Sequence, residues 1–254
     1  MNFACWKRIC RLWGAGLVLF VLRLIQDRTG FDPDTGLSLP SVPGAALVIL
    51  LVALAVLELV LARRRSKEKV SFADQFAPPG KSMTALVLGC MLLAAGGILL
   101  ALDAVMNGDG IAPLVTGALA LASAGGLLLL TRRLRAGDEL TVAPILPAMF
   151  FGVFWVLAVY LPRSSDPVLA RFYLQVLAAA MVSYAFSQLA GFLRGESCAR
   201  TFTPVADLAV MLCIAAMADG GRGMVLLCLG CALVLTVFVL LQREDVSSPG
   251  QADS

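Results

Sequence analysis

Two aspartates stand two positions apart in the stretch GFDPDTGLSLP, residues 30–40, where Asp34-Thr35-Gly36 spells the catalytic triplet of aspartic proteases. That chemistry requires two such loops, so that two carboxylates share one proton, and the sequence contains no second Asp-Thr-Gly or Asp-Ser-Gly. A calcium loop is excluded as well, because the third oxygen ligand, the glycine at position six and the closing glutamate are missing. We therefore interpret Asp32 and Asp34 as part of a Pro-Asp-Thr-Gly turn between two helices.

A second candidate is a group of cysteines. Cys228 and Cys231 lie one helical turn apart in the stretch CLGC, and Cys213 is expected at a similar depth on the preceding helix. This layout resembles the reactive pair of the vitamin K epoxide reductase family, membrane thiol oxidoreductases whose pair lies on a helix near the outer face. The resemblance covers that pair alone, because the family also uses a pair on a loop and the predicted outer loops contain no cysteine. A reactive thiolate needs nearby positive charge, which only Arg222 supplies, so the sequence favours cysteine as a small packing residue.

One predicted helix carries a stripe of polar side chains. Within residues 167–192, positions spaced three and four apart form one face that includes Tyr173, Tyr184, Ser187 and Gln188. Polar groups inside the membrane face a partner helix or a water-filled cavity, because contact with lipid would leave them without hydrogen bonds. We therefore predict these four as substrate-facing candidates. The simpler explanation is hydrogen bonding between helices, worth about 1 kcal/mol per contact.

Acidic residues inside the predicted helices are few. Glu58 lies about one turn before the arginines at 63–65 and is expected to pair with them at the interface, which argues against a proton relay. Asp207 lies about one turn into its predicted helix, where the helix N-terminus favours negative charge. The chain contains no histidine, which excludes a Ser-His-Asp triad and every histidine-containing metal motif. We predict no enzymatic activity, no metal site and no cofactor.

The elements that must position these residues are membrane-spanning helices. Hydrophobic residues make up 59% of 254 positions and charged residues 15%, with a mean hydropathy of +0.89, whereas soluble domains are roughly half apolar and a quarter charged. Because about 20 apolar residues cross a bilayer, we predict an all-α, polytopic transmembrane helical bundle in a single domain, residues 1–243. Its eight predicted spans are residues 9–26, 42–62, 84–104, 112–131, 143–161, 167–192, 204–218 and 222–241.

Prolines mark several of the predicted helix starts. A proline fits the first helical turn, where its missing N–H has no intrahelical partner. Five such prolines are Pro43, Pro113, Pro144, Pro167 and Pro204. Thr203 is then expected to be the N-cap of the seventh span.

The distribution of basic residues predicts the orientation. With the N-terminus inside, fifteen of the 20 Lys and Arg residues fall in inner segments, as the positive-inside rule requires. Both termini are therefore predicted to be cytoplasmic, with a disordered polar tail at 244–254. The basic loop 63–83 is expected to lie on the inner membrane surface, with Phe72 and Phe76 in the interface and its lysines and arginines on anionic headgroups. Nucleic acid is not an expected partner, because no long basic arm is present.

The first predicted span also has the basic and apolar regions of a signal peptide, but no small-residue cleavage site follows. We therefore predict a retained helix and a multi-pass protein of the plasma membrane. Spans three and four are rich in small residues, including the ridge Gly117, Leu121 and Gly125, which predicts a tight helix pair or a homodimer contact. The pairs Gly96-Gly97 and Gly125-Gly126 are the candidates for mid-span helix breaks.

Residues 110–132 also align weakly with 221–243, at an offset of 111, as in the internal repeats common among transporters. Together with the polar stripe, this favours a small transporter or permease-like unit. The lack of a central charge and the few candidate breaks favour the alternative, a membrane scaffold or accessory subunit of a larger complex. An outer-face thiol oxidoreductase using Cys228 and Cys231 is the third alternative.

Overall fold

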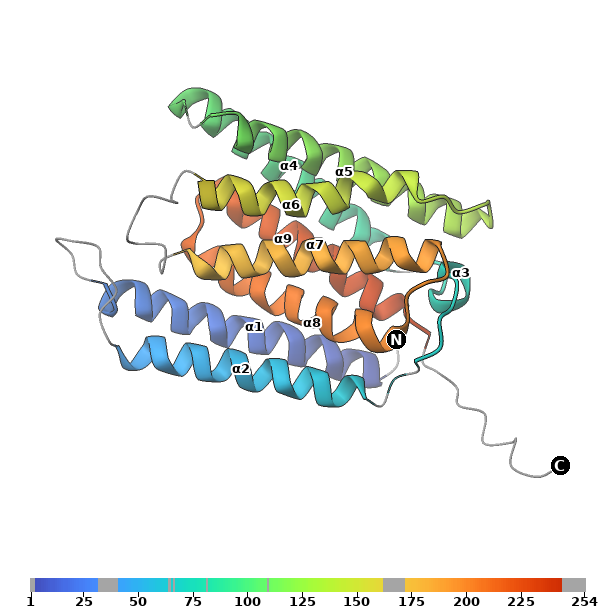
Figure 1. Cartoon of the computed structure of the whole chain (residues 1–254), viewed down its shortest axis with the longest axis horizontal. Helices are drawn as coiled ribbons and strands as arrows, with labels where there is room; N and C mark the ends of the chain where they lie inside the picture. The colour runs from blue at the N-terminus through green and yellow to red at the C-terminus, as the bar shows by residue number, and fades with distance from the viewer. Residues whose placement is uncertain are drawn as a thin grey trace.

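The computed structural model describes residues 3–31, 41–63, 65, 67–80, 82–108, 110–161 and 172–243 (Figure 1). Within these ranges the chain is an all-α bundle. Its long helices are α1 (Phe3–Thr29), α2 (Val42–Ala62), α4 (Met83–Asn107), α5 (Ile111–Ala136), α6 (Leu146–Tyr160), α7 (Tyr173–Leu193), α8 (Ala199–Ala216) and α9 (Arg222–Leu241). Its short helices are α3 (Phe72–Gln75), η1 (Ala143–Ile145) and η4 (Met217–Asp219).

Eight helices in the described ranges are long and apolar enough to cross a membrane, which confirms the predicted number of spans. The chain is therefore a multi-pass integral membrane protein. The turn with Asp32 and Asp34, the predicted start of span six at Pro167 and the tail 244–254 lie outside the described residues.

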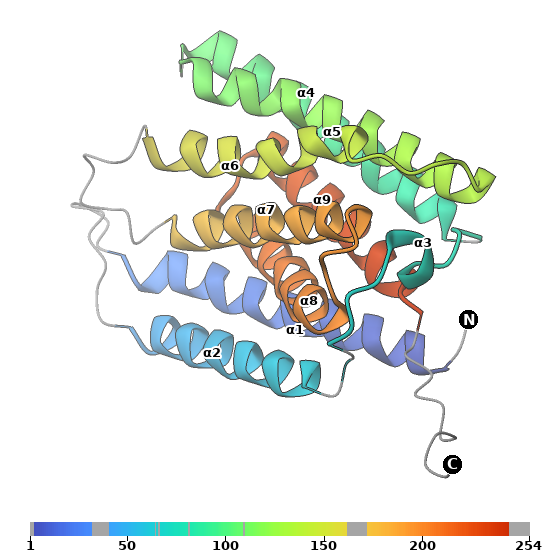
Figure 2. The same cartoon turned by 45° about the vertical axis from the view of Figure 1, so that its right-hand side comes forward.

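Six helices, α4 to α9, form a closed ring, which we call the six-helix body. Each packs against the next along the chain, and α9 returns to pack against α4. The remaining two, the α1–α2 hairpin, pack mainly on α8 (Figure 2). We call the end of the bundle where α1 begins, α3 lies and α9 ends the basic end (Figure 1).

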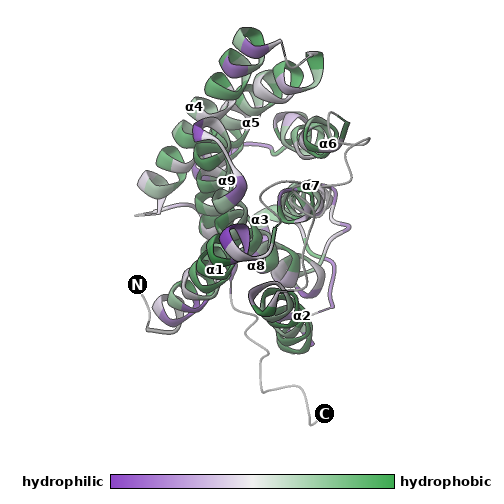
Figure 3. Ribbon diagram, turned by 90° about the vertical axis from the view of Figure 1, so that its left-hand side faces the viewer, coloured by the Kyte–Doolittle hydropathy of each residue, from purple (hydrophilic) through white to green (hydrophobic). Residues whose placement is uncertain are grey.

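Burial follows this arrangement. In α8, 78% of the span is buried, because α1, α2, α7 and α9 all pack on it. In α2, which has the highest mean hydropathy together with α9, only 17% is buried. Most residues along the helices are hydrophobic (Figure 3), and many large apolar side chains are exposed on the outside of the bundle, as expected where lipid is the solvent.

Glycines let α4 approach two helices at once. A Cβ built on Gly96 would lie 2.5 Å from the backbone nitrogen of Leu227 in α9, and one on Gly97 would lie 2.8 Å from the carbonyl oxygen of Gly117 in α5. Such close approach is how small residues drive helix association in membranes. The pair at 96–97 is therefore a packing device, and both α4 and α5 run through their glycine pairs without a break.

The start of α8 differs from the prediction. The helix begins at Ala199, after an N-cap position at Cys198, so Pro204 lies inside the helix and Thr203 is not its N-cap. Neighbouring helices allow a proline inside a membrane helix by satisfying the freed backbone group. Asp207 consequently lies two turns into α8 instead of one.

The basic loop also differs. Phe72 and Phe76 are buried in protein and not in the membrane interface. Phe76 packs edge-on against three rings of the helix ends, those of Phe192, Phe202 and Phe238, at centroid distances of 5.3–5.9 Å. Backbone hydrogen bonds attach the loop to its surroundings, from Val70 N–H to Ser197 O, from Ala77 N–H to Leu241 O and from Arg243 N–H to Gln75 O. We call this segment, residues 67–80, the plug, because it covers the basic end of α7, α8 and α9.

The weak internal repeat gains no support from the packing. An offset of 111 would make α8 the counterpart of α4 and α5 the counterpart of α9. In the described residues α4 packs closely on α9, whereas α8 and α5 share no comparable contact.

Candidate functional site: two charge networks between α1 and α8

Charged residues of α1 meet Asp207, which lies midway along α8, and Asp219, which lies in η4 just beyond the end of α8. The two helices run side by side in the same direction, away from the basic end (Figure 1). Arg8 and Arg11 of α1 therefore reach Asp207, and Arg23 reaches Asp219 in η4, the short continuation of α8. The interface has one charge network toward each membrane face.

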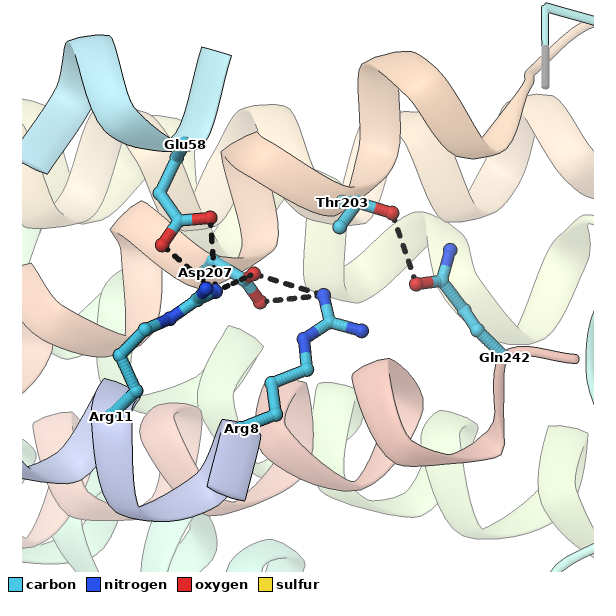
Figure 4. Close-up of polar contacts among 6 residues, drawn as sticks. All are labelled: Arg8, Arg11, Glu58, Thr203, Asp207 and Gln242. Atoms are coloured by element: carbon cyan, nitrogen blue, oxygen red, sulfur yellow. Dashed lines mark hydrogen bonds and ion pairs between the residues drawn. The ribbon is translucent and has the colours of Figure 1, made fainter. Parts of the chain in front are cut away.

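The first network, at the basic end, centres on Asp207. Its side chain is 1% exposed. One amino nitrogen of Arg8, Nη2, donates to both carboxylate oxygens, at 3.0 and 2.9 Å (Figure 4). Arg11 adds a longer contact, with its Nη2 3.6 Å from Asp207 Oδ2. Arg8 is thus the principal partner of Asp207.

Glu58 of α2 completes this network, which we call the basal network. Its side chain is 2% exposed. Arg11 Nη2 donates to Oε2 at 3.2 Å and lies 3.0 Å from Oε1, where the ion pair is close but lacks hydrogen-bonding geometry. Glu58 thus pairs with Arg11 of α1, and neither Arg63 nor Arg65, the described arginines of the cluster at 63–65, is paired with it. Two carboxylates and two guanidinium groups make the basal network electrically neutral.

The neutrality explains how these groups exist inside the spans. A lone charge in hydrocarbon is costly, and ionisable residues in membrane helices therefore pair with one another and mark functional sites. The pairing itself contributes little net stability, since the desolvation of two charges offsets their attraction. The basal network is not sealed on every side, because the side chain of Arg11 is 38% exposed.

The second network, the distal network, lies at the opposite end. Arg23 is completely buried, and its Nε lies 2.6 Å from Asp219 Oδ1. Its Nη1 donates to Gln26 Oε1 at 2.8 Å, and its guanidinium carbon lies 5.4 Å from the ring centre of Tyr173. Gln175 Nε2 donates to the Asp219 carbonyl at 2.9 Å. Side chains of α1, α7 and η4 therefore converge on one buried arginine.

Between the networks the interface is apolar and closed. Leu12 and Leu19 are fully buried. Gly16 leaves room for Ile214, since a Cβ at Gly16 would lie 2.8 Å from Ile214 Cδ1. Trp13 Nε1 donates to Thr236 Oγ1 of α9 at 3.3 Å. The α1–α8 contact thus has buried apolar side chains between its two charge networks.

The predicted polar stripe is divided among three places. Tyr173 belongs to the distal network. Tyr184, 47% exposed, and Ser187 line a shallow groove of about 390 Å³ between α6 and α7, on the outside of the bundle. Gln188 Oε1 accepts hydrogen bonds from the hydroxyls of Ser197 and Thr201, at 3.2 and 3.1 Å. These residues do not form one site, and a substrate-facing role for them stays a prediction.

The candidate cysteines are all inside the protein. Cys213, Cys228 and Cys231 are free thiols with no exposed surface. No group of three or more metal-ligating His, Cys, Asp or Glu residues occurs in the described part of the chain. A thiol exchange reaction would need a path to these sulfur atoms that the described packing does not provide.

The sequence reading did not find the networks, because it treated Arg8, Arg11 and Asp219 as markers of topology. One signal was available. Arginines at positions 8 and 23 of one span and aspartates at 207 and 219 of another are separated by 15 and 12 residues, so both pairs match in depth if the two helices run side by side. The chain matched no protein-family model, no curated protein and no solved structure.

Proposed function

We propose that this chain is a small transporter or permease-like unit of the plasma membrane, with both termini in the cytoplasm. Its moving part is the α1–α2 hairpin and its fixed part is the six-helix body. The observation that carries the proposal is the placement of two separate buried charge networks along the same helix pair, one at Asp207 and one at Asp219. Transporters work by opening a central path to one membrane face at a time.

The energetics of the two networks suit a gate that opens toward one membrane face at a time. A buried ion pair gains little over the same charges in water, so a network can open where water enters. Separating the charged groups of a network where they would face hydrocarbon costs a prohibitive free energy. Each network can therefore open only toward its own membrane face, while the other holds the hairpin on α8.

The test places a reporter cysteine beside each network in a cysteine-free background. Leu12→Cys reports on the interface near the basal network and Leu19→Cys near the distal one, and both positions are fully buried in the closed state. Labelling by a membrane-impermeant thiol reagent is measured in inside-out and right-side-out vesicles. Asp207→Asn should raise labelling of Leu12→Cys from the basic side, and Asp219→Asn that of Leu19→Cys from the other side. A weakening of 1 kcal/mol corresponds to about fivefold.

The control is Glu196→Gln, which removes an exposed ion pair with Arg194 at 3.4 Å and should leave both reporters unchanged. Each variant must first elute as a monodisperse species. If neither network variant alters labelling from its own side, the gate does not exist and the transporter proposal fails.

A second candidate is a scaffold or accessory subunit, and it rests on a different observation. Aromatic side chains of the six-helix body, among them Phe151, Trp155 and Phe186, are fully buried in the hydrophobic core. Leu121, 42% exposed, and Gly125, with nothing near its Cβ position, give α5 an outward face for a second copy. Exposed Lys67 and Lys69 at the basic end suit contact with anionic headgroups. Mild-detergent purification from the native membrane separates the two functions, since a stoichiometric partner favours the scaffold and a lone monodisperse protein opposes it.

A further inference from the structure

We infer that Asp207 is a proton-binding site, and that the proton is the coupling ion of this protein. The inference rests on the proposed function. When the α1–α2 hairpin leaves α8 at the basic end, Asp207 takes up one proton from the water there. It releases this proton when Arg8 returns.

The inference starts from an asymmetry within the basal network. Arg11 lies 3.0 and 3.2 Å from the oxygens of Glu58 but 3.6 Å from Asp207. Arg11 and Glu58 both belong to the hairpin, so they remain paired when it moves. Arg8 is the close partner of Asp207, at 2.9 and 3.0 Å, and it moves away with α1.

Among the described residues, Arg8 and Arg11 are the basic side chains that pair with Asp207, and Arg200 lies about two turns earlier on α8 itself. The helices packed on α8 are α1, α2, α7 and α9. From α1 the charged groups near this site are Arg8 and Arg11, next to the exposed Lys7, and from α2 the charged group is Glu58. The helix α7 contains no Asp, Glu, Lys or Arg, and α9 contains only Arg222, at its distal start.

Charge balance then gives the number of protons. From the basal network the departing hairpin takes two arginines and one glutamate, a net charge of +1, and the excess charge sits on Arg8. The six-helix body keeps one carboxylate on its most buried helix. An isolated carboxylate in a low-dielectric site neutralises instead of staying charged. One proton on Asp207 removes that charge, so one proton accompanies each opening.

Infrared difference spectroscopy of the full chain in proteoliposomes tests this directly. Spectra at pH 8 and pH 5 are compared for the carbonyl stretch of a protonated carboxyl group, and the spectrum of Asp207→Asn is subtracted, because exposed Asp and Glu titrate near pH 4 and are already about a tenth protonated at pH 5. The wild-type band should lose its Asp207 component in Asp207→Asn and keep that component in Glu58→Gln, which removes any contribution from Glu58. Glu58→Gln is the matched control, because it removes the other buried carboxylate of the same network.

A third variant tests the assignment even if Asp207→Asn does not fold. Arg8→Gln keeps the carboxylate and removes its partner, so the band should appear at a pH higher by about one unit or more, as expected for the loss of an adjacent opposite charge. A band that is reduced in Glu58→Gln but unchanged in Asp207→Asn would overturn the assignment.

The outcomes also separate this inference from the proposed function. If Asp207→Asn exposes the reporter at Leu12 while the wild type shows no Asp207 component of the carboxyl band down to pH 5, the gate stands and the proton site is wrong. If the band behaves as expected but no variant changes the labelling of Leu12→Cys, the carboxyl group titrates without gating and the proposed function fails.

Discussion

Gly96 of α4 and Leu227 of α9 approach so closely that a methyl group on Gly96 would lie 2.5 Å from the Leu227 backbone nitrogen. Backbone atoms cannot yield as a flexible side chain would. The contact belongs to a series along the same pair of helices, since a Cβ on Gly230 would lie 2.5 Å from the nitrogen of Leu93. The closure of the six-helix body therefore depends on glycines.

Substitution at this contact is the first prediction. Gly96→Ala should lower the free energy of unfolding by about 1–3 kcal/mol, the usual cost of overpacking a tight core. Gly125→Ala is the control, because nothing lies within 4 Å of its Cβ position and alanine favours the helix. Thermal unfolding in detergent measures both, and equal melting temperatures for the two variants would contradict the packing.

The distal network gives the second prediction. Arg23→Met leaves Asp219 buried beside an apolar side chain, and breaking a buried ion pair from one side costs about 3–5 kcal/mol. The double variant Arg23→Met/Asp219→Asn should recover part of this loss, because no charge is then left alone. Arg194→Met, at an exposed pair with side chains 57% and 62% exposed, should change stability by at most about 1 kcal/mol. A double-mutant cycle of unfolding free energies that showed no coupling between Arg23 and Asp219 would count against the network.

The plug gives the third prediction. Phe76→Ala removes a fully buried ring from the aromatic cluster, so the plug should be released. Cleavage by trypsin after Lys67 and Lys69 should accelerate, and stability should fall by about 3–5 kcal/mol. Phe150→Ala, at a position 54% exposed on the lipid side, serves as the control. Unchanged proteolysis in Phe76→Ala would show that the plug is held by its backbone hydrogen bonds alone.

Thiol reactivity gives the fourth prediction and decides the oxidoreductase alternative. Cys213, Cys228 and Cys231 should react with N-ethylmaleimide at least about 100-fold more slowly than the exposed Cys10, because their reaction requires local opening that costs a few kcal/mol. Mass spectrometry of the intact protein before and after denaturation counts the labels. Rapid labelling of Cys228 or Cys231 in the folded protein would contradict this prediction and would support the thiol oxidoreductase alternative.

Eight spans were predictable because each arises from a local run of apolar residues, and neighbours in space do not alter such a run. The charge networks were not, because they join residues 196 and 199 positions apart. The depth of a charge can be read from one helix, whereas its partner depends on which helices pack together. For the same reason the sequence did not predict the partner of Glu58, which is Arg11 of another helix and not an arginine that is near in sequence.

Local signals also competed with tertiary packing. The helix α8 begins before Pro204, since helices on all its sides satisfy what the proline removes. Phe72 and Phe76 have the spacing of an amphipathic surface segment, but both rings pack against aromatic rings at the helix ends. Tyr184 and Gln188 share a helical stripe, and only the neighbouring helices decide that one faces outward and the other binds the 197–201 turn.

The long separation between Arg8 and Asp207 also bears on how the chain is made. Ribosomes add about 5–20 residues per second, so α1 reaches the bilayer roughly 10–40 s before α8 is complete. During that interval Arg11 has Glu58 within the same hairpin, whereas Arg8 and Arg23 have no aspartate of α8 or η4 to receive them. The contact between the hairpin and the six-helix body is therefore completed only after the last quarter of the chain, which contains α8 and η4, has been made.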